Sequence, residues 1–357
     1  GKYNIGITAG IETDIVSAKW LDCCNKMDLV IVPSEHSKNG FLKSVYDKLN
    51  DSPDGKQEKI GELRLEKPME VLFEGVDGGY KPLHHNDIDE EFFGWLNSEV
   101  PEKFAFLHVG QWTKGGYGED RKDIARMIKV FYESFANKKK QPALILKTSG
   151  AGFSILDRED CLGKINQVKG MFPSDWKLPN VYLLHGDMNK KELNYLYNHP
   201  KTKAMVSFTH GEGFGRPLLE ATMVGLPVLA SGWSGQVDFL DEDKSLLIGG
   251  KLDKVPKSVV WKDIIIPESQ WFTVDENQAY RAFNFMYENL KEIDGKAEKL
   301  MEKNRKKFTL DKMTEKLDEI MESYMKNIPQ QVELKLPELK KKKVNKEDIK
   351  LPKLEKV

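Results

Sequence analysis

The stretch from Ser207 to Gln236, SFTHGEGFGRPLLEATMVGLPVLASGWSGQ, decides the fold that this chain can adopt. An apolar run ending at Phe208 predicts a buried strand, a glycine-rich loop at 210–216 follows it, and Pro217 opens a helix. Proline suits the first turn of a helix, where its missing N–H costs nothing. Glycines let the backbone approach a ligand closely, and the free N–H groups of a new helix favour phosphate. The order of strand, loop and helix therefore predicts a phosphate site.

Two glutamates with seven residues between them flank the start of this helix. Glu212 lies in the loop, and Glu220 lies about one turn inside the helix. A carboxylate repels a phosphate, so we expect Glu220 to hydrogen-bond a diol such as a ribose beside the phosphates. Gly225 and Pro227 then end the helix, and the apolar residues 228–231 predict the next buried strand.

These residues resemble the nucleotide-sugar site of the retaining GT-B glycosyltransferases of family 4 (glycosyl transferases group 1), which carry two glutamates at this spacing. The likeness extends over roughly residues 1–325. It implies an α/β protein of the GT-B type, with two Rossmann-like domains built on parallel sheets, the first of them incomplete. It also implies a hexosyltransferase-type reaction, in which a sugar moves from a nucleotide-diphosphate sugar to an acceptor with retention and without a metal or other cofactor.

The resemblance assigns roles to the residues of the loop and helix. Glu212 contacts the donor sugar and is the expected catalytic residue, while Glu220 holds the ribose hydroxyls. Backbone N–H groups around the loop stabilise the charge of the leaving diphosphate. The further donor contacts are expected from Gly213, Phe214, Gly215 and Arg216.

A chain of 357 residues is long enough for two domains. By the resemblance, residues 1–102 form part of an acceptor-side domain and residues 103–309 form the nucleotide-sugar domain. A helix at about 310–327 returns to complete the first domain, and a lysine-rich tail follows at 329–357. The acceptor-side domain is shorter than those of relatives, so we expect the sequence to be a fragment of a longer protein.

The acceptor-side segment alternates apolar runs with helical patterns. Glu12 and Thr13 follow the first strand, where ligands bind in open α/β sheets, and are predicted to face the acceptor. Asp87 and Asp89 form a D-x-D pair that could bind a metal, but their place at an acidic helix start favours a structural role. We predict strands at 3–8, 28–34 and 69–73, helices at 17–25, 38–49 and 87–96, and a turn-rich surface excursion at 50–66.

The nucleotide-sugar domain is predicted to open with a strand at 104–110 and a helix that runs to about residue 135. Relatives carry an arginine directly after the glycine of this strand and a lysine at the helix start, and the two grip the diphosphate. Lys122 matches the lysine, but Gln111 stands at the arginine position. The alternatives for the missing charge are Arg121, Lys114 and Arg216.

Other candidate residues follow the later strands of this domain. Lys147, at the end of its strand, either faces the cleft or lies on the surface. The resemblance implies that His185, Gly186 and Met188 hold the nucleotide base through their backbone, and for His185 a polar strand-end role is favoured over that of a catalytic base. We predict strands at 143–149, 180–184, 237–240 and 245–248, and helices at 155–168, 190–198 and 276–290.

The composition excludes several classes of protein. The net charge of −1 creates no overall positive electrostatic field that would attract nucleic acid. No apolar run in the sequence is long enough to cross a membrane. Cys23, Cys24 and Cys161 lack metal-ligand spacing, so we expect reduced thiols and no metal site. With no secretory signal visible, the sequence predicts a cytoplasmic protein, with peripheral attachment to a membrane as an alternative.

The tail at 329–357 repeats the pattern K-L-P-x-L at 335–339 and 350–354. It is too polar to bury a core, and a solubilising role is favoured over docking on a partner. The acceptor stays open among a carbohydrate, a lipid-linked group and a protein. The alternative function is a non-catalytic nucleotide-sugar-binding or scaffold module, and the third is an epimerase or phosphorylase of the same fold.

Overall fold

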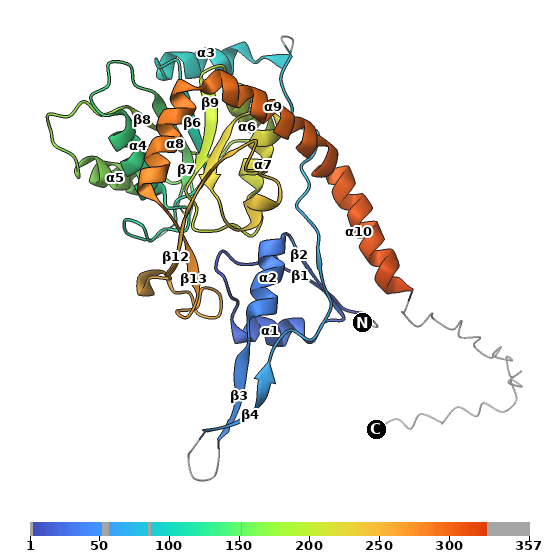
Figure 1. The fold of residues 1–357 in the computed structure, drawn as a ribbon. Helices are drawn as coiled ribbons and strands as arrows, with labels where there is room; N and C mark the ends of the chain where they lie inside the picture. Colours follow the sequence, from blue (N-terminus) through green and yellow to red (C-terminus); the bar gives the residue numbers. More distant parts are fainter. Residues whose placement is uncertain (1–2, 52–56, 85–86, 114, 151, 327–357) are drawn as a thin grey trace, which may run out of the picture.

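Two parallel sheets organise the computed structural model, which describes residues 3–51, 57–84, 87–113, 115–150 and 152–326 (Figure 1). The first sheet has three strands in the order β1-β2-β5. Its middle strand is buried along its whole length, as expected for a parallel strand covered on both faces. The strands are β1 (Ile5–Ile7), β2 (Leu29–Val32) and β5 (Met69–Val71).

The second sheet has six parallel strands in the order β11-β10-β9-β6-β7-β8. Read from β8 to β11 and numbered along the chain within this sheet, the order is 3-2-1-4-5-6, the doubly wound arrangement, and it reverses between β6 and β9. Ligands bind at the carboxyl ends of the strands at such a point, so the loops after β6 and β9 are the place to look for a site. The strands are β6 (Ala105–Gln111), β7 (Ala143–Ser149), β8 (Val181–Leu184), β9 (Thr202–Ser207), β10 (Val228–Ser231) and β11 (Leu246–Ile248).

Helices cover both faces of the second sheet and bury one apolar cluster on each face. Phe131 and Phe283 are fully buried on one face, and Leu219 and Leu300 lie in the cluster on the other. Burying each such side chain stabilises the fold by about 1.5–3 kcal/mol. The first face is covered by α4 (Ile124–Phe135), α5 (Ile155–Lys169) and α8 (Glu276–Glu288), and the second by α6 (Lys190–Asn198), α7 (Arg216–Met223) and α9 (Leu290–Lys307).

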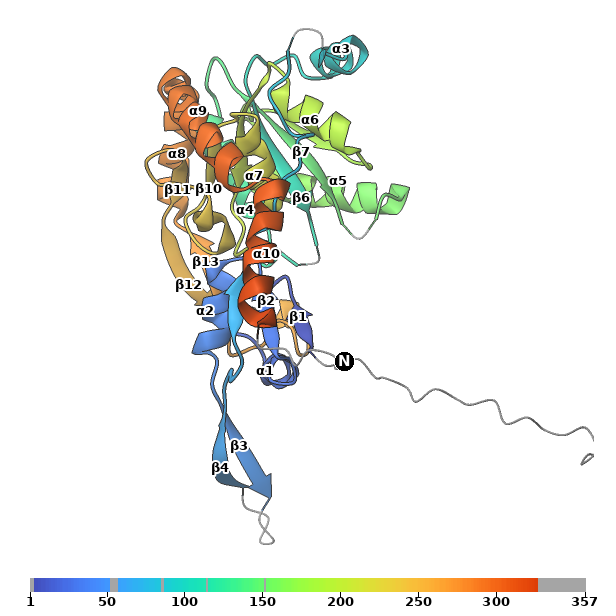
Figure 2. The same cartoon turned by 90° about the vertical axis from the view of Figure 1, so that its right-hand side faces the viewer.

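The last described helix, α10 (Leu310–Met325), returns to the first sheet (Figures 1 and 2). Its Ile320 is buried against Leu29 and Ile31 of β2. The junction between α9 and α10 is tied to the segment after β5, where the Val76 N–H donates to the Phe308 carbonyl oxygen at 3.0 Å. The chain therefore returns to its amino-terminal sheet at α10.

A β-hairpin arm that the sequence did not reveal joins the two sheets. It consists of β12 (Gly250–Lys254) and β13 (Gln270–Val274), which pair antiparallel between the two halves of the molecule (Figure 1). Residues of the arm are buried in the apolar cluster of the first sheet, with Trp271 only 1% exposed. The Gln270 N–H also donates to the Asp14 carboxylate at 2.7 Å. The arm thus contributes to the core of the first sheet.

One prediction from the amino-terminal half was wrong, and another was right in place but not in form. The helix expected at 38–49 ends early, since α2 spans Glu35–Lys43 and begins at the Ser34 cap. The apolar residues after it follow a helical spacing, but their backbone pairs instead in a hairpin of β3 (Tyr46–Asp51) and β4 (Gln57–Leu63). The surface excursion expected at 50–66 is built from this hairpin, and most of β4 is exposed, as a surface excursion requires.

The remaining differences are small. Residues 237–240 do not form a strand, because the turn at η2 (Gly235–Asp238) is a 3-10 helix. The helix α1 spans Ala18–Cys24, and α3 spans Glu90–Glu99 and is capped by Asp89, whose carboxylate accepts from the Phe92 N–H at 3.0 Å. Within the described ranges, no helix is both long and apolar enough to span a bilayer. The tail at 329–357 lies outside the described residues.

Candidate functional site

The glycine-rich loop connects β9 to α7 and packs directly on the first sheet. A Cβ atom on Gly213 would overlap the Ala9 carbonyl oxygen, and one on Gly211 would overlap the Glu12 carbonyl oxygen. The Gly213 carbonyl oxygen also accepts a hydrogen bond from the Ser34 hydroxyl. These two glycines are therefore required by a neighbouring loop of the protein itself, whereas the sequence suggested only the approach of a ligand.

Gly215 places the amino end of α7 at the mouth of this loop. Its φ of 96° lies in the left-handed region, which glycine adopts without strain. It caps the helix without a side chain that could accept the N–H groups of the first turn, so those groups and the positive end of the helix dipole are suited to an anion. The helix ends as predicted, with Gly225 at a φ of 80°. Phe214 is buried in the core beside the loop.

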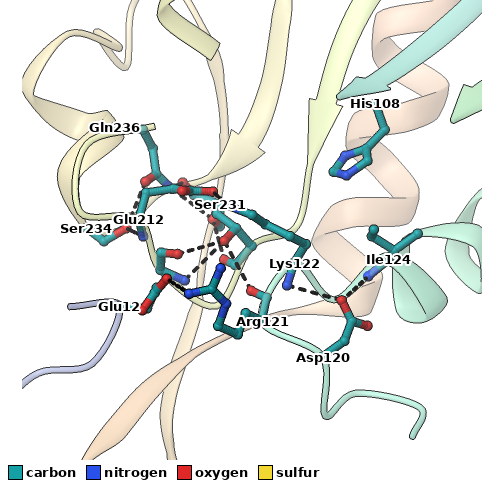
Figure 3. Close-up of polar contacts among 12 residues, drawn as sticks. Glu12, His108, Asp120, Arg121, Lys122, Ile124, Glu212, Ser231, Ser234 and Gln236 are labelled. Atoms are coloured by element: carbon teal, nitrogen blue, oxygen red, sulfur yellow. Dashed lines mark hydrogen bonds and ion pairs between the residues drawn. The ribbon is translucent and has the colours of Figure 1, made fainter. Parts of the chain in front are cut away.

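Lys122 and Glu212 form an ion pair across the point where the strand order reverses (Figure 3). Lys122 comes from the loop after β6 and Glu212 from the loop after β9, and each side chain is 15% exposed. The Lys122 N–H donates to Asp120 at 3.1 Å, and the Glu212 N–H donates to Ser234 at 2.9 Å, so both backbones are fixed. The structure thus brings Lys122, predicted to bind the diphosphate, into contact with Glu212, predicted to contact the donor sugar.

Arg121 forms a second ion pair, with Glu12 from the loop after β1 (Figure 3). This pair connects the loops of the two sheets, since its members are 109 positions apart in the chain. Of the three alternatives for the missing charge, Arg121 is the one next to the Lys122–Glu212 pair. Arg216 pairs with Glu220, and Lys114 lies outside the described residues. Gln111 ends β6 and is exposed.

Glu220 is a residue of α7 whose carboxylate is surrounded by hydrogen-bond donors. It accepts from Arg216 Nε at 3.1 Å and from the Tyr197 hydroxyl at 3.3 Å. Burial raises the pKa of Glu220, and these hydrogen bonds partly oppose the shift. Burial also raises the pKa of Tyr80, which is the other phenol at this carboxylate. Glu220 is thus a positioned hydrogen-bond acceptor close to the helix start.

A cavity of about 350 Å³ lies where the loops of the two sheets face each other. Glu12 and Glu74 reach it from the side of the first sheet, and Glu212, Arg216 and Arg121 reach it from the second. A neighbouring cavity of about 1020 Å³ shares Arg121 and extends past Gln111 toward the end of β7. Thr13 is not brought there, because it is fully buried and its hydroxyl donates to the Ile15 carbonyl oxygen.

The remaining predicted residues form a second group at the ends of β7 and β8. The Lys147 ammonium donates to the Gly186 carbonyl oxygen, and burial lowers the pKa of Lys147. His185 lies with Nε2 2.8 Å from the Asp157 carboxylate of α5. Met188 packs against the apolar cluster on the α6 face. Both groups lie at the carboxyl edge of the same sheet, the first at the loops after β6 and β9 and the second at the ends of β7 and β8.

Sequence reasoning missed a buried polar cluster behind Lys122. Asp120, Asp123 and His210 are fully buried, and the His210 ring stacks on Trp271 with centroids 4.1 Å apart. Burial raises the pKa of Asp120 to about 6 and that of Asp123 to about 6. In the sequence these aspartates look like members of a solvated polar loop, and only tertiary contact shows them to be buried. Across the described part of the chain, no three His, Cys, Asp or Glu side chains come together as metal ligands.

Comparison with known proteins gives structural relatives only. No protein-family model and no curated protein matches the chain. Among solved structures, HepE of Anabaena in complex with UDP and glucose superposes with a TM-score of 0.59 at 14% identity, over 89% of this chain and 71% of that one. Sucrose-phosphate synthase of Thermosynechococcus elongatus superposes with a TM-score of 0.58 at 15% identity, over 86% of this chain and 61% of that one.

A third relative is the UDP-forming α,α-trehalose-phosphate synthase of Burkholderia xenovorans in complex with glucose-6-phosphate. It has a TM-score of 0.52 and 11% identity, over 85% of this chain and 63% of that one. The fold of the chain is that of the GT-B glycosyltransferases. The predicted α/β class with two Rossmann-like parallel sheets is confirmed, and at these identities the likeness is one of fold. Family 4 and retention stay predictions.

Proposed function

We propose that the chain is a glycosyltransferase of the hexosyltransferase type, which moves a sugar from a nucleotide-diphosphate sugar to an acceptor hydroxyl. The observation that carries the proposal is the Lys122–Glu212 pair at the reversal point of the sheet, beside the amino end of α7. A cation and the amino end of a helix both attract phosphate, and a carboxylate beside them can accept hydrogen bonds from sugar hydroxyls. The relatives whose names include UDP make UDP-glucose the first donor to test.

Two cations and the amino end of one helix would stabilise the negative charge that develops on the leaving diphosphate. Lys122 and Arg121 supply positive charge, and the first N–H groups of α7 supply hydrogen bonds. Both cations are paired with carboxylates in this structure, so the diphosphate would replace Glu212 at Lys122 and Glu12 at Arg121. Glu212 would then turn to a hydroxyl group of the donor sugar. On the resemblance, we further propose retention of configuration and no metal ion.

The nucleoside is assigned to Glu220 and to the segment that follows β8. Glu220 would hold the ribose hydroxyls, since its carboxylate is fixed by Arg216 and Tyr197 close to the start of α7. The backbone at Gly186 and Met188 would hold the base, and Lys147 fixes the Gly186 carbonyl oxygen. Family 4 membership follows the same resemblance and remains part of the proposal.

Calorimetric titration with UDP, GDP and ADP tests the donor site. We expect one of the three to bind and Lys122→Met to weaken that binding by about 1.5–3 kcal/mol, the contribution of charge-assisted hydrogen bonds. Lys251→Met is the matched control, because the Lys251 side chain is 76% exposed on the arm. A folded parent protein that binds none of the three nucleotides would contradict the proposal.

A non-catalytic nucleotide-sugar-binding module is the second candidate, and one observation favours it. Gln111 stands where relatives carry an arginine, and its exposed side chain adds no charge to the site. Product analysis separates the two functions. Nucleotide release together with a glycosylated acceptor supports the transferase, whereas nucleotide-sugar binding without any product supports the module.

A further inference from the structure

Glu74 reaches the 350 Å³ cavity from the first sheet, opposite the glycine-rich loop. It lies just beyond β5, in a segment whose backbone is held on both sides. The Leu72 N–H donates to the Val32 carbonyl oxygen at 2.8 Å, and the Leu310 N–H donates to the Val76 carbonyl oxygen at 3.0 Å. The position of Glu74 is therefore fixed by the sheet and by the junction between α9 and α10.

Gly75 shows how closely this junction approaches. A Cβ atom on Gly75 would lie 2.6 Å from the Thr309 carbonyl oxygen and 2.7 Å from the Leu310 Cα atom. No side chain fits there, so the returning helix passes directly behind Glu74. The Glu74 side chain is consequently presented to the cavity by a rigid part of the fold.

Among the residues that the structure describes, Glu74 differs from the other charged residues of the cavity in having no partner. Glu12 is paired with Arg121, and Glu212 and Arg216 are paired with residues of the second sheet. Over the described residues, the Glu74 carboxylate takes part in no hydrogen bond or ion pair. Burial and the nearby Glu212 charge raise the pKa of Glu74, and Arg216 opposes the shift. A half-buried carboxylate without a partner is costly, and ligand hydroxyl groups would offset that cost.

Charge and position decide which part of a substrate would lie at Glu74. The diphosphate is excluded, because a carboxylate repels it and because Lys122 and the start of α7 lie on the other sheet. The side of the cavity formed by the first sheet carries two carboxylates, Glu12 and Glu74. That side is suited to hydroxyl groups and unsuited to an anionic group.

We propose that Glu74 binds the acceptor, and that its carboxylate accepts a hydrogen bond from a hydroxyl group of an uncharged sugar. This rests on the proposed transferase function, with the donor on the second sheet and the acceptor on the first. It names the acceptor class, a neutral sugar in preference to a sugar phosphate.

The test uses the full chain with UDP-glucose, or with the glucose donor of whichever nucleotide the parent binds, and the acceptors glucose, maltose and glucose-6-phosphate. We expect Glu74→Ala to lower kcat/KM for glucose and maltose at least tenfold and to leave the nucleotide Kd within twofold. Glu74→Gln should also reduce the preference for neutral over phosphorylated acceptors, and Glu74→Asp should restore part of the activity. Glu66→Gln is the control, since Glu66 is exposed and lies outside the cavity.

Two outcomes would overturn the assignment of Glu74. Either the variants keep the parent's kcat/KM for every acceptor, or they weaken nucleotide binding as much as they reduce transfer, which would make Glu74 a donor-side or structural residue. A parent that binds nucleotide but transfers to no acceptor would instead refute the transferase function itself. Circular dichroism and Tm measurements on each variant separate a local effect from loss of the fold.

Discussion

The side chains of Lys122 and Glu212 neutralise each other at the place where the second sheet reverses its strand order. This pairing has a consequence for the proposed donor site, because an incoming diphosphate would compete with Glu212 for the same ammonium group. The carboxylate thus keeps the cation in place, and it would become free for a sugar hydroxyl only when phosphate binds.

Glu212→Gln should separate nucleotide binding from sugar transfer. Removing the competing charge leaves Lys122 available, so we expect UDP affinity to stay equal or to increase by up to about threefold, a change of less than 1 kcal/mol. Transfer should fall by roughly 10²–10³, the usual cost of losing one stabilising group of an active site. Calorimetry and nucleotide-release assays measure the two effects.

Glu242→Gln is the control for this prediction, because Glu242 is exposed and lies away from the cavity. The competition argument is wrong if Glu212→Gln binds UDP much more weakly than the parent does. It is also wrong if transfer by this variant proceeds at the parent's rate.

The cluster behind Lys122 makes stability depend on pH in a defined direction. Burial raises the pKa of Asp120 to about 6, above the value near 3.8 of an unfolded chain. The folded state therefore binds protons more tightly, and stability from this group increases as the pH falls from about 6 toward 3.8. Above pH 6 the ionised carboxylate, buried beside Asp123, lowers the free energy of unfolding.

Asp120→Asn tests this direction. The amide oxygen can still accept from the N–H groups of Lys122 and Ile124, so the loop geometry should persist. We expect the variant to gain about 1–3 kcal/mol of stability at pH 7.5 and to lose most of that gain at pH 4.5. Urea titrations at both pH values measure it, with the exposed Asp318→Asn as a control. A gain that is equal at the two pH values would contradict the assignment.

Gly213→Ala should force the loops of the two sheets apart. The added methyl would overlap the Ala9 carbonyl oxygen, and overpacking of this kind costs about 1–3 kcal/mol. Gly163→Ala is the matched control, since a Cβ there meets nothing within 4 Å and alanine in the interior of α5 should add about 0.5–1 kcal/mol. The expected result is a lower Tm for the first variant and a higher Tm for the second. Equal Tm values for Gly213→Ala and the parent would show that the loops are not held in contact.

The core of the site was predictable because its signals are local. A proline in the first turn and a glycine after the last turn place α7 correctly, whatever packs around it. The Glu12–Arg121 pair was not predictable, since nothing local relates residues 109 positions apart. Glu74 was visible only as part of a connection between domains. Its fixed position at the cavity depends on the returning α9–α10 junction, which is a tertiary contact.

The arm was missed for the same reason. Its strands are short, and their apolar residues are divided between two cores, since Trp271 packs in the core of the first sheet and Phe272 and Val274 pack in that of the second. The wrong helix at 38–49 is the reverse case, because its apolar spacing fits a helix until hairpin pairing takes over the backbone. Local patterns therefore located the glycine-rich loop, and long-range packing decided how the first sheet is built.

Trp271→Ala should weaken the connection between the two sheets more than any single loop contact does. Trp271 is 1% exposed, belongs to the core of the first sheet, and stacks on His210 of the glycine-rich loop. Truncating a buried tryptophan costs about 3–5 kcal/mol. Because this side chain bridges both halves, we also expect unfolding followed by circular dichroism to lose cooperativity, with a smaller urea m-value. Trp261→Ala is the matched control on the same arm, since Trp261 is 61% exposed and should cost less than about 0.5 kcal/mol. If the two variants unfold alike, the arm does not couple the sheets, and the first sheet must be held against the glycine-rich loop mainly by α10.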